Sequence, residues 1–236
     1  TKCDTLPANG NGIKMDEGSL LNMNYGKLFG GNVGLQLKKN TATINNTIIH
    51  TFQNVGVYGI HSSLTMNNVV MNNCGEADFA IAAGGTYYLN YCTLANYWNL
   101  NPSMSAVGIF ASNTWENENG EIESGLVTLN VKNSIIYGDT LDLVSLSNNS
   151  AGTAINARFD NTLMKLSSNS AFNPIGSDII KNEDPKFQNY FTQKMNLRVK
   201  DDSPAKKKGT NLNNNNTTKD IVGITRTYPA TLGAYQ

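Results

Sequence analysis

The 236-residue sequence predicts an all-β solenoid, a coil in which the short parallel strands of each turn stack on those of the turn before. Composition supports this fold, because the chain holds 36 Asn and 21 Gly, residues that favour turns and are poor in helix interiors. A recurring motif also supports it: an Asn or Tyr stands between two short segments of alternating apolar residues. A third apolar segment precedes most copies, and no helical periodicity lies between them.

The recurring motif places one turn residue in each copy. These residues are Tyr25, Asn46, Asn68, Tyr91, Asn133 and Asn161, separated by 21, 22, 23, 42 and 28 positions. The period-two alternation of apolar residues stops at each turn residue and restarts after it, which indicates a strand, a sharp bend and a second strand. The interval of 42 fits either two periods or one turn that carries a long insertion, and the spacing leaves both open.

Five further apolar segments are expected to supply a third strand to each turn. They cover residues 33–38, 57–61, 79–83, 106–111 and 141–146. Such strands would stack at about 4.8 Å, the strand spacing of a sheet. We expect about six turns over residues 1–170, with columns of apolar side chains inside and an insertion at about 95–127. Asn side chains at the bends are expected to hydrogen-bond to one another from turn to turn.

This pattern resembles the right-handed parallel β-helix family, the pectin-lyase-like fold. Residues 171–236 depart from the repeat and resemble the closing segment of many Bacteroidota surface β-helix proteins. The matching residues are Asp184, Pro185, Phe187, Leu197, Ser203, Pro204, Ala205, Gly209, Asp220, Gly223, Arg226, Gly233, Ala234 and Tyr235. Gln236 departs from the pattern, where an acid is common. We interpret this segment as an irregular C-terminal cap, in which Arg226 pairs with an Asp over the last turn.

The resemblance implies an exported protein, at the cell surface or extracellular, of a Gram-negative bacterium. Residues 1–3 fit the slot after a bend, so we expect further turns or a cap upstream, because an open strand edge invites aggregation. Any tether to the outer membrane would also lie upstream, for instance the lipidated Cys of a lipoprotein. No other membrane contact is expected, since the sequence has no run of 18 apolar residues.

Charge and cysteine usage bear on two further classes of partner. Lys and Arg together number 18, as do Asp and Glu, so the chain lacks the basic excess of a nucleic-acid-binding protein. Cys3, Cys74 and Cys92 show no metal-site spacing, and only two His residues are present. We therefore expect no metal or other cofactor and interpret the cysteines as small buried residues.

The interruption at 95–127 holds the candidate ligand-binding residues. It contains Tyr97, Trp98, Trp115, Glu116 and Glu118. Aromatic side chains on loops of a rigid scaffold can stack on sugars or anchor a protein partner. The alternative is a solvated acidic loop whose Trp side chains pack onto the coil. A calcium site formed by the Glu residues is possible in principle, but the Asp-x-Asp-x-Asp-Gly frame is missing.

Charged residues on the expected outer face are sparse. Arg158 and Asp160 lie two positions apart, which favours a surface ion pair over a catalytic Arg. One Asp is not the pair of carboxylates that glycoside hydrolysis needs. Two further acidic pairs, Asp139 with Asp142 and Glu76 with Asp78, are expected in bends, where acidic residues serve turn chemistry.

Two functions are compatible with these features. The first is a non-enzymatic surface module that binds a glycan or a protein, or a subunit of an envelope assembly. The second is a carbohydrate-active enzyme, a polysaccharide lyase or hydrolase, as the resemblance implies for acidic polysaccharides. The sparse outer charge and the missing carboxylate pair favour the first, and the question of enzymatic activity stays open.

Overall fold

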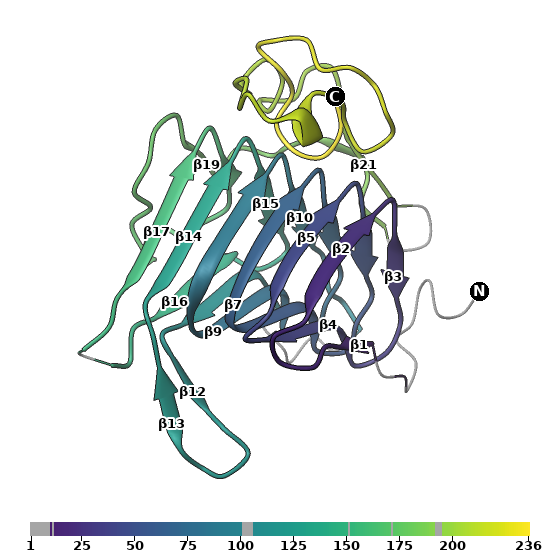
Figure 1. The fold of residues 1–236 in the computed structure, drawn as a ribbon. Helices are drawn as coiled ribbons and strands as arrows, with labels where there is room; N and C mark the ends of the chain where they lie inside the picture. The colour runs from purple at the N-terminus through teal and green to yellow at the C-terminus, as the bar shows by residue number, and fades with distance from the viewer. Residues whose placement is uncertain (1–9, 11, 101–105, 151, 171, 192–194) are drawn as a thin grey trace.

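Two large parallel sheets dominate the computed structural model, which describes residues 10, 12–100, 106–150, 152–170, 172–191 and 195–236 (Figure 1). The larger sheet follows the order β1 (Ile13–Lys14), β4 (Val33–Lys38), β7 (Val55–Asn67), β9 (Ala77–Asn90), β11 (Val107–Ser112) and β16 (Val144–Ser147). It also includes β2 (Leu20–Asn24), β5 (Thr41–Asn45), β14 (Val127–Lys132) and β17 (Ile155–Asp160). This all-β arrangement of parallel strands fits a β-solenoid.

The second parallel sheet packs behind the first. Its strands are β3 (Lys27–Phe29), β6 (Ile48–His50), β8 (Val70–Asn72), β10 (Thr93–Asn96), β15 (Ile135–Gly138), β18 (Leu163–Met164) and β19 (Ile180–Lys181). Two antiparallel pairs complete the strands, β12 (Thr114–Glu116) with β13 (Ile122–Ser124) and β20 (Phe187–Asn189) with β21 (Asn196–Val199). A short 3-10 helix spans Asn215–Thr217.

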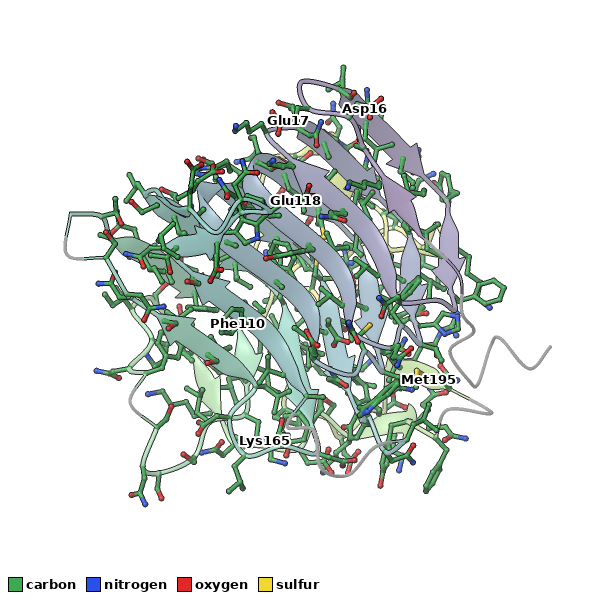
Figure 2. All side chains as sticks on the ribbon, turned by 90° about the horizontal axis from the view of Figure 1, so that it is seen from below. Asp16, Glu17, Phe110, Glu118, Lys165 and Met195 are labelled. Carbon is green, nitrogen blue, oxygen red and sulfur yellow. The ribbon has the colours of Figure 1, made fainter. Side chains whose placement is uncertain are left out.

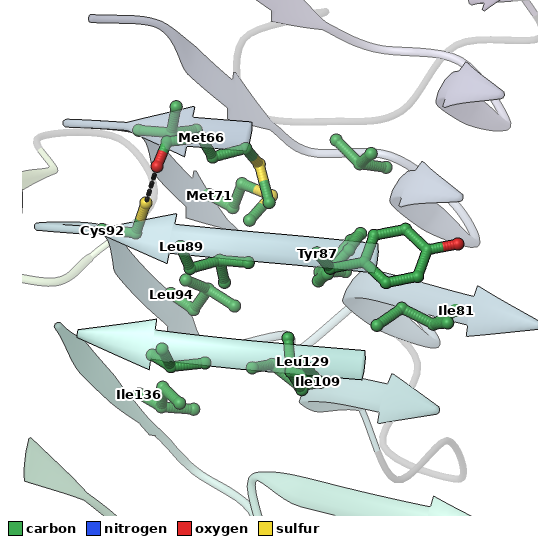
Figure 3. Packing of buried hydrophobic residues seen from close by; sticks show 14 of the residues in the cluster. Met66, Met71, Ile81, Tyr87, Leu89, Cys92, Leu94, Ile109, Leu129 and Ile136 are labelled. Atoms are coloured by element: carbon green, nitrogen blue, oxygen red, sulfur yellow. Dashed lines mark hydrogen bonds between the residues drawn. The ribbon is translucent and has the colours of Figure 1, made fainter. Parts of the chain in front are cut away.

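Strand register confirms the predicted inward columns. One column runs through Leu21, Ala42, Leu64, Tyr87, Leu129 and Ala157, each paired with the next across the large sheet. Because Tyr87 pairs directly with Leu129, the interval of 42 residues is one turn with an insertion. Figure 3 shows neighbouring columns meeting in the core, where the Cys92 thiol donates to the Met66 carbonyl oxygen at 3.6 Å.

All six predicted turn residues adopt the left-handed backbone conformation, with φ between 47° and 53°. Asn tolerates this region better than most residues, which explains its recurrence at the bends. The predicted Asn ladder is present over part of the coil: Asn68 Nδ2 donates to Asn46 Oδ1 at 3.0 Å, and Asn46 Nδ2 donates to Asn24 Oδ1 at 3.0 Å. It ends at Tyr91, whose side chain has no amide to continue the ladder.

The segment at 95–127 is not a single excursion from the coil. Strand β10 continues to Asn96 and β11 lies within the large sheet, between β9 and β16. The excursion that the structure describes is therefore the β12–β13 hairpin, and residues 101–105 lie outside the described part. Figure 1 shows this hairpin extending from the lower edge of the sheet.

The C-terminal segment has two parts: residues 172–181 lie over the last turn, where β19 pairs with β18, and residues 187–191 and 195–236 pack along the side of the coil (Figure 1). Its apolar residues pack on the outer face of the second sheet, where Val70, Ala95, Ile135 and Leu163 meet Leu197, Val199, Ala205, Ile221, Leu232 and Ala234. At the end of the coil Phe172 covers Phe159, with ring centroids 5.5 Å apart.

Arg226 has different partners from the predicted Asp. Its Nη2 donates to Asn68 Oδ1 at 2.9 Å and to the carbonyl oxygen of Gly233 at 3.1 Å, and its guanidinium lies 3.9 Å from the centroid of the Tyr91 ring. The residue is 4% exposed. The segment is thereby attached to bends near the middle of the coil.

Candidate functional site

A row of outward-facing side chains crosses the strands β4, β7, β9, β11 and β16. Strand register places Gln36, Tyr58, Ala80, Phe110 and Ser145 side by side in this row. Their neighbours along each strand point into the core, since side chains alternate between the two faces of a sheet. The row therefore consists of one small side chain between two aromatic ones, with a polar side chain at each end.

Because a small side chain stands between two large ones in this row, the surface has a groove of about 390 Å³. We call it the outer groove, and its lining residues are Val55, Glu76, Ala77, Ala80, Val107, Phe110 and Ser145. Ala77 and Ala80 leave room above the sheet because their side chains are short. Phe110 stays 36% exposed, and Tyr58 packs against Val55, Ala77 and Ala80.

Among the described residues that line the outer groove, Glu76 is the one that carries a charge. Its backbone is fixed on both sides, because its N–H donates to the Asn54 carbonyl oxygen at 2.8 Å and its carbonyl oxygen accepts from Val107 N at 3.0 Å. Its carboxylate is exposed and forms no hydrogen bond or ion pair with the residues that the structure describes. Burial raises the pKa of Tyr58, and the negative charge of Glu76 raises it further.

The β12–β13 hairpin bounds the same face of the sheet. Trp115 on β12 packs against Ile60, Ala82 and Ala83, and Lys38 Nζ lies 5.1 Å from the centroid of its ring. Ala82 is two residues along β9 from Ala80, so the hairpin lies about 7 Å beyond the outer groove. Figure 2 shows Phe110, Glu118 and Glu17 on the face turned toward the viewer.

Ion pairs hold the surroundings of the hairpin together. Lys38 Nζ lies 2.9 Å from Glu17 Oε1, and Lys39 Nζ lies 3.6 Å from Glu17 Oε2. His61 Nε2 lies 3.2 Å from Glu123 Oε2. A hydrogen bond from Asn117 is the main reason that the pKa of Glu123 is lowered. Glu17 thus forms ion pairs with both lysines. The exposed Glu116 and Glu118 form no ion pair with described residues.

Tyr97 and Trp98 do not project from the coil as a ligand-stacking pair would. Tyr97 is 8% exposed and stacks on Tyr190, with ring centroids 4.4 Å apart. Trp98 is 9% exposed, and its Nε1 has no hydrogen-bond partner among the described residues. For these two residues the structure agrees with the alternative in which the aromatic rings pack onto the coil.

The structure separates the remaining predicted site residues into two places. Trp115, Glu116 and Glu118 lie together on the hairpin, whereas Arg158 and Asp160 lie on β17 at the far end of the sheet. Arg158 Nη2 contacts Asp160 Oδ1 at 2.8 Å, and Arg158 Nε donates to Asp160 Oδ2 at 2.9 Å. This geometry is the surface ion pair that the sequence favours.

Two of the acidic residues expected in bends behave differently from each other. Asp142 accepts from Ser167 N at 2.8 Å and from Ser167 Oγ at 2.9 Å, as a bend residue would. Asp78 corrects the expectation: it lies in β9, is fully buried beside Cys74, and its carboxyl oxygens have no hydrogen-bond partner among the described residues. Burial raises the pKa of Asp78 well above its usual range, an effect that Cys74 offsets only in part.

The described residues contain no group of three or more His, Cys, Asp and Glu side chains arranged to hold a metal ion. Within the same residues, no helix has the length and apolar character needed to cross a membrane. Cys74 and Cys92 are buried free thiols, as predicted, and Cys3 lies outside the described residues.

Sequence reasoning missed the outer groove. Tyr58 and Phe110 occupy outward positions of the third strands and not the outward positions before the bends. The alternation of side chains could have indicated the groove, because an aromatic, a small and an aromatic residue occupy equivalent outward positions in successive turns.

No family model matches the chain, and no curated protein and no solved structure matches it either.

Proposed function

We propose that the protein is an exported surface module that binds a glycan in the outer groove without chemically altering it. The observation that carries the proposal is the groove itself, with the exposed ring of Phe110 above a floor of two alanines. Its volume of about 390 Å³ falls within the range of small-ligand sites. An aromatic ring on a rigid sheet offers a sugar a flat apolar face at little entropic cost.

The surroundings of the groove suit an extended ligand. Ser145 lines both the outer groove and a second hollow of about 310 Å³, which Asp142 and Phe172 also line. At the other end of the row, Gln36 and Lys14 line a hollow of about 260 Å³. The row therefore offers hydrogen-bonding groups on either side of the aromatic centre. A glycan chain running across the strands would contact several turns at once.

The glycan-binding proposal is preferred to a carbohydrate-active enzyme. Hydrolysis of a glycosidic bond generally uses two carboxylates that flank it. Among the described residues that line the outer groove, Glu76 is the one carboxylate. The elimination chemistry expected of a lyase has no supporting arrangement here either, since no Arg or Lys lines this groove.

The remaining parts of the proposal rest on the repeat and the closing segment of the sequence. We propose a right-handed parallel β-helix of the pectin-lyase-like kind with about six turns and an irregular C-terminal cap, from a Gram-negative bacterium of the Bacteroidota. Its partners would be a surface glycan and not nucleic acid, and it would meet a membrane only through an upstream anchor. Cell fractionation with an antibody to this chain tests the location: recovery in the cytoplasm would contradict it.

A glycan array followed by calorimetry tests the binding. We expect at least one polysaccharide to bind, and Phe110→Ala to weaken that binding about 5- to 50-fold through the loss of stacking. Tyr88→Ala is the matched control, because Tyr88 is 43% exposed on β9 but lies outside the groove. Absence of binding, or equal losses in both variants, would contradict the proposal. Release of reducing or unsaturated ends would establish the enzyme alternative.

A further inference from the structure

We infer that the outer groove selects glycans that carry a protonated amine, because Glu76 and Phe110 together form a site for a cationic sugar substituent. This inference rests on the proposed function and names the ligand class of the same site. It assigns Glu76 the role of a specificity-determining residue, and Phe110 that of a stacking residue for neutral and cationic sugars alike.

The first step of the inference is the availability of the Glu76 carboxylate. It lines the groove together with five apolar side chains and Ser145, and it has no ion-pair partner among the described residues. An amine bound between Glu76 and the apolar wall would be partly removed from water, which strengthens its attraction to the carboxylate. The Phe110 ring lines the same groove, so the sugar that carries the amine can stack on it.

The second step is the charge around the groove. Lys38 contacts the hairpin at Trp115, and both Lys38 and Lys39 pair with Glu17. Lys14 belongs to the same row of side chains but lies three strands from β9, which Glu76 directly precedes, and three strands correspond to about 14 Å.

A separation of that size exceeds the screening length of about 8 Å at physiological ionic strength. Lys14 therefore does little to offset Glu76 at the groove. The local potential disfavours polyuronides and other acidic chains, for which a cationic groove would be needed. Neutral sugars can still stack on Phe110, but only a cationic sugar gains from both Phe110 and Glu76.

The test compares two oligosaccharides that differ only at one substituent, which is a free amine in one and an acetamide in the other. Glucosamine oligomers and their fully N-acetylated counterparts share one backbone, and mildly acidic pH keeps the free amine protonated. We expect the intact protein to bind the amine form about 5- to 10-fold more tightly. Glu76→Gln should remove this preference while leaving affinity for the acetylated form unchanged. Glu118→Gln, an exposed carboxylate outside the groove lining, should keep the preference.

Each outcome of this comparison decides something definite. Equal affinity for the two oligomers, a preference for the acetylated form, or binding of some other glycan only would overturn the amine inference and leave glycan binding intact. A preference that survives Glu76→Gln would also overturn it, because the selection would then lie elsewhere. If no glycan binds at all, the proposed function fails together with the inference. Matching thermal unfolding of the variants shows that Glu76→Gln leaves the fold unchanged.

Discussion

Arg226 donates a hydrogen bond from Nη2 to Oδ1 of Asn68 at 2.9 Å, although 158 positions separate the two residues in the chain. The contact joins the C-terminal segment to the bend of a central turn. Asn68, the last Asn of the ladder before Tyr91, thus accepts from Arg226 and donates to Asn46. Arg226 therefore makes one of several polar contacts, such as the hydrogen bond from Tyr91 to the Thr210 carbonyl oxygen, that couple the stability of the coil to that of its lateral segment.

Replacing Arg226 by Ala should lower the free energy of unfolding by about 2–4 kcal/mol. The substitution leaves Asn68 Oδ1 and the carbonyl oxygen of Gly233 without their buried donor, and it empties the space above the Tyr91 ring. Urea unfolding measures the effect. Arg198→Ala is the control, since Arg198 lies half-buried 4.8 Å from the centroid of the Tyr235 ring and should lose about 0.5–1 kcal/mol. Equal losses would refute a special role for Arg226.

Replacing Asn46 by Gly and by Ala should separate the two roles of a bend residue. Both variants lose the ladder hydrogen bonds to Asn24 and Asn68, which we expect to cost about 1 kcal/mol. Only Ala also suffers at a φ of 49°, where it should lose about 1 kcal/mol more than Gly. Thermal and urea unfolding of the pair measure this difference. An Ala variant as stable as the Gly variant would show that backbone conformation does not select Asn here.

Asp78 should make the protein less stable as pH rises. Its folded-state pKa lies above the unfolded value, so the folded state retains a proton that the unfolded state releases. The free energy of unfolding is therefore highest below the pKa that Asp78 has in the unfolded state. It falls at higher pH, by up to about 1.4 kcal/mol per pH unit. Urea unfolding from mildly acidic to neutral pH should show this slope, and Asp78→Asn should remove it.

Asp142 supplies a control of opposite sign for Asp78. Partial burial alone would raise its pKa, but hydrogen bonds from Ser167 and Ser170 outweigh this and lower it. The stability that Asp142 contributes is thus present above its unfolded pKa and is lost in acid. Asp142→Asn should leave the slope between mildly acidic and neutral pH unchanged. A slope that persists in Asp78→Asn would mean that another group causes it.

The buried thiols should resist modification until the protein unfolds. Burial raises the pKa of Cys92 to about 12 and that of Cys74 well above its usual range, so neither thiolate forms readily near neutral pH. In a Cys3→Ser background, an aromatic disulfide reagent should label neither residue in buffer and both in urea. Labelling of either thiol in buffer at a rate independent of urea would contradict this burial.

The sequence by itself determined the repeat. The spacing of the turn residues and the alternation around them depend on local backbone conformation and on side-chain direction, which nearby residues decide. Inward columns and sharp bends could therefore be predicted position by position; strand register confirms the columns, and the backbone at the six turn residues confirms the bends. The ion pair between Arg158 and Asp160 was predictable for the same reason, since its two partners lie on one strand.

Only the tertiary structure decided where the non-repeating parts lie. The side-on packing of the C-terminal segment depends on apolar outer residues of the second sheet, such as Val70 and Ile135, which the alternation would have assigned to solvent. The burial of Asp78 and Trp98 depends on neighbours from other turns. The outer groove likewise arises because Ala80 stands between Tyr58 and Phe110 across three strands, a relationship that exists only once stacking has fixed their register.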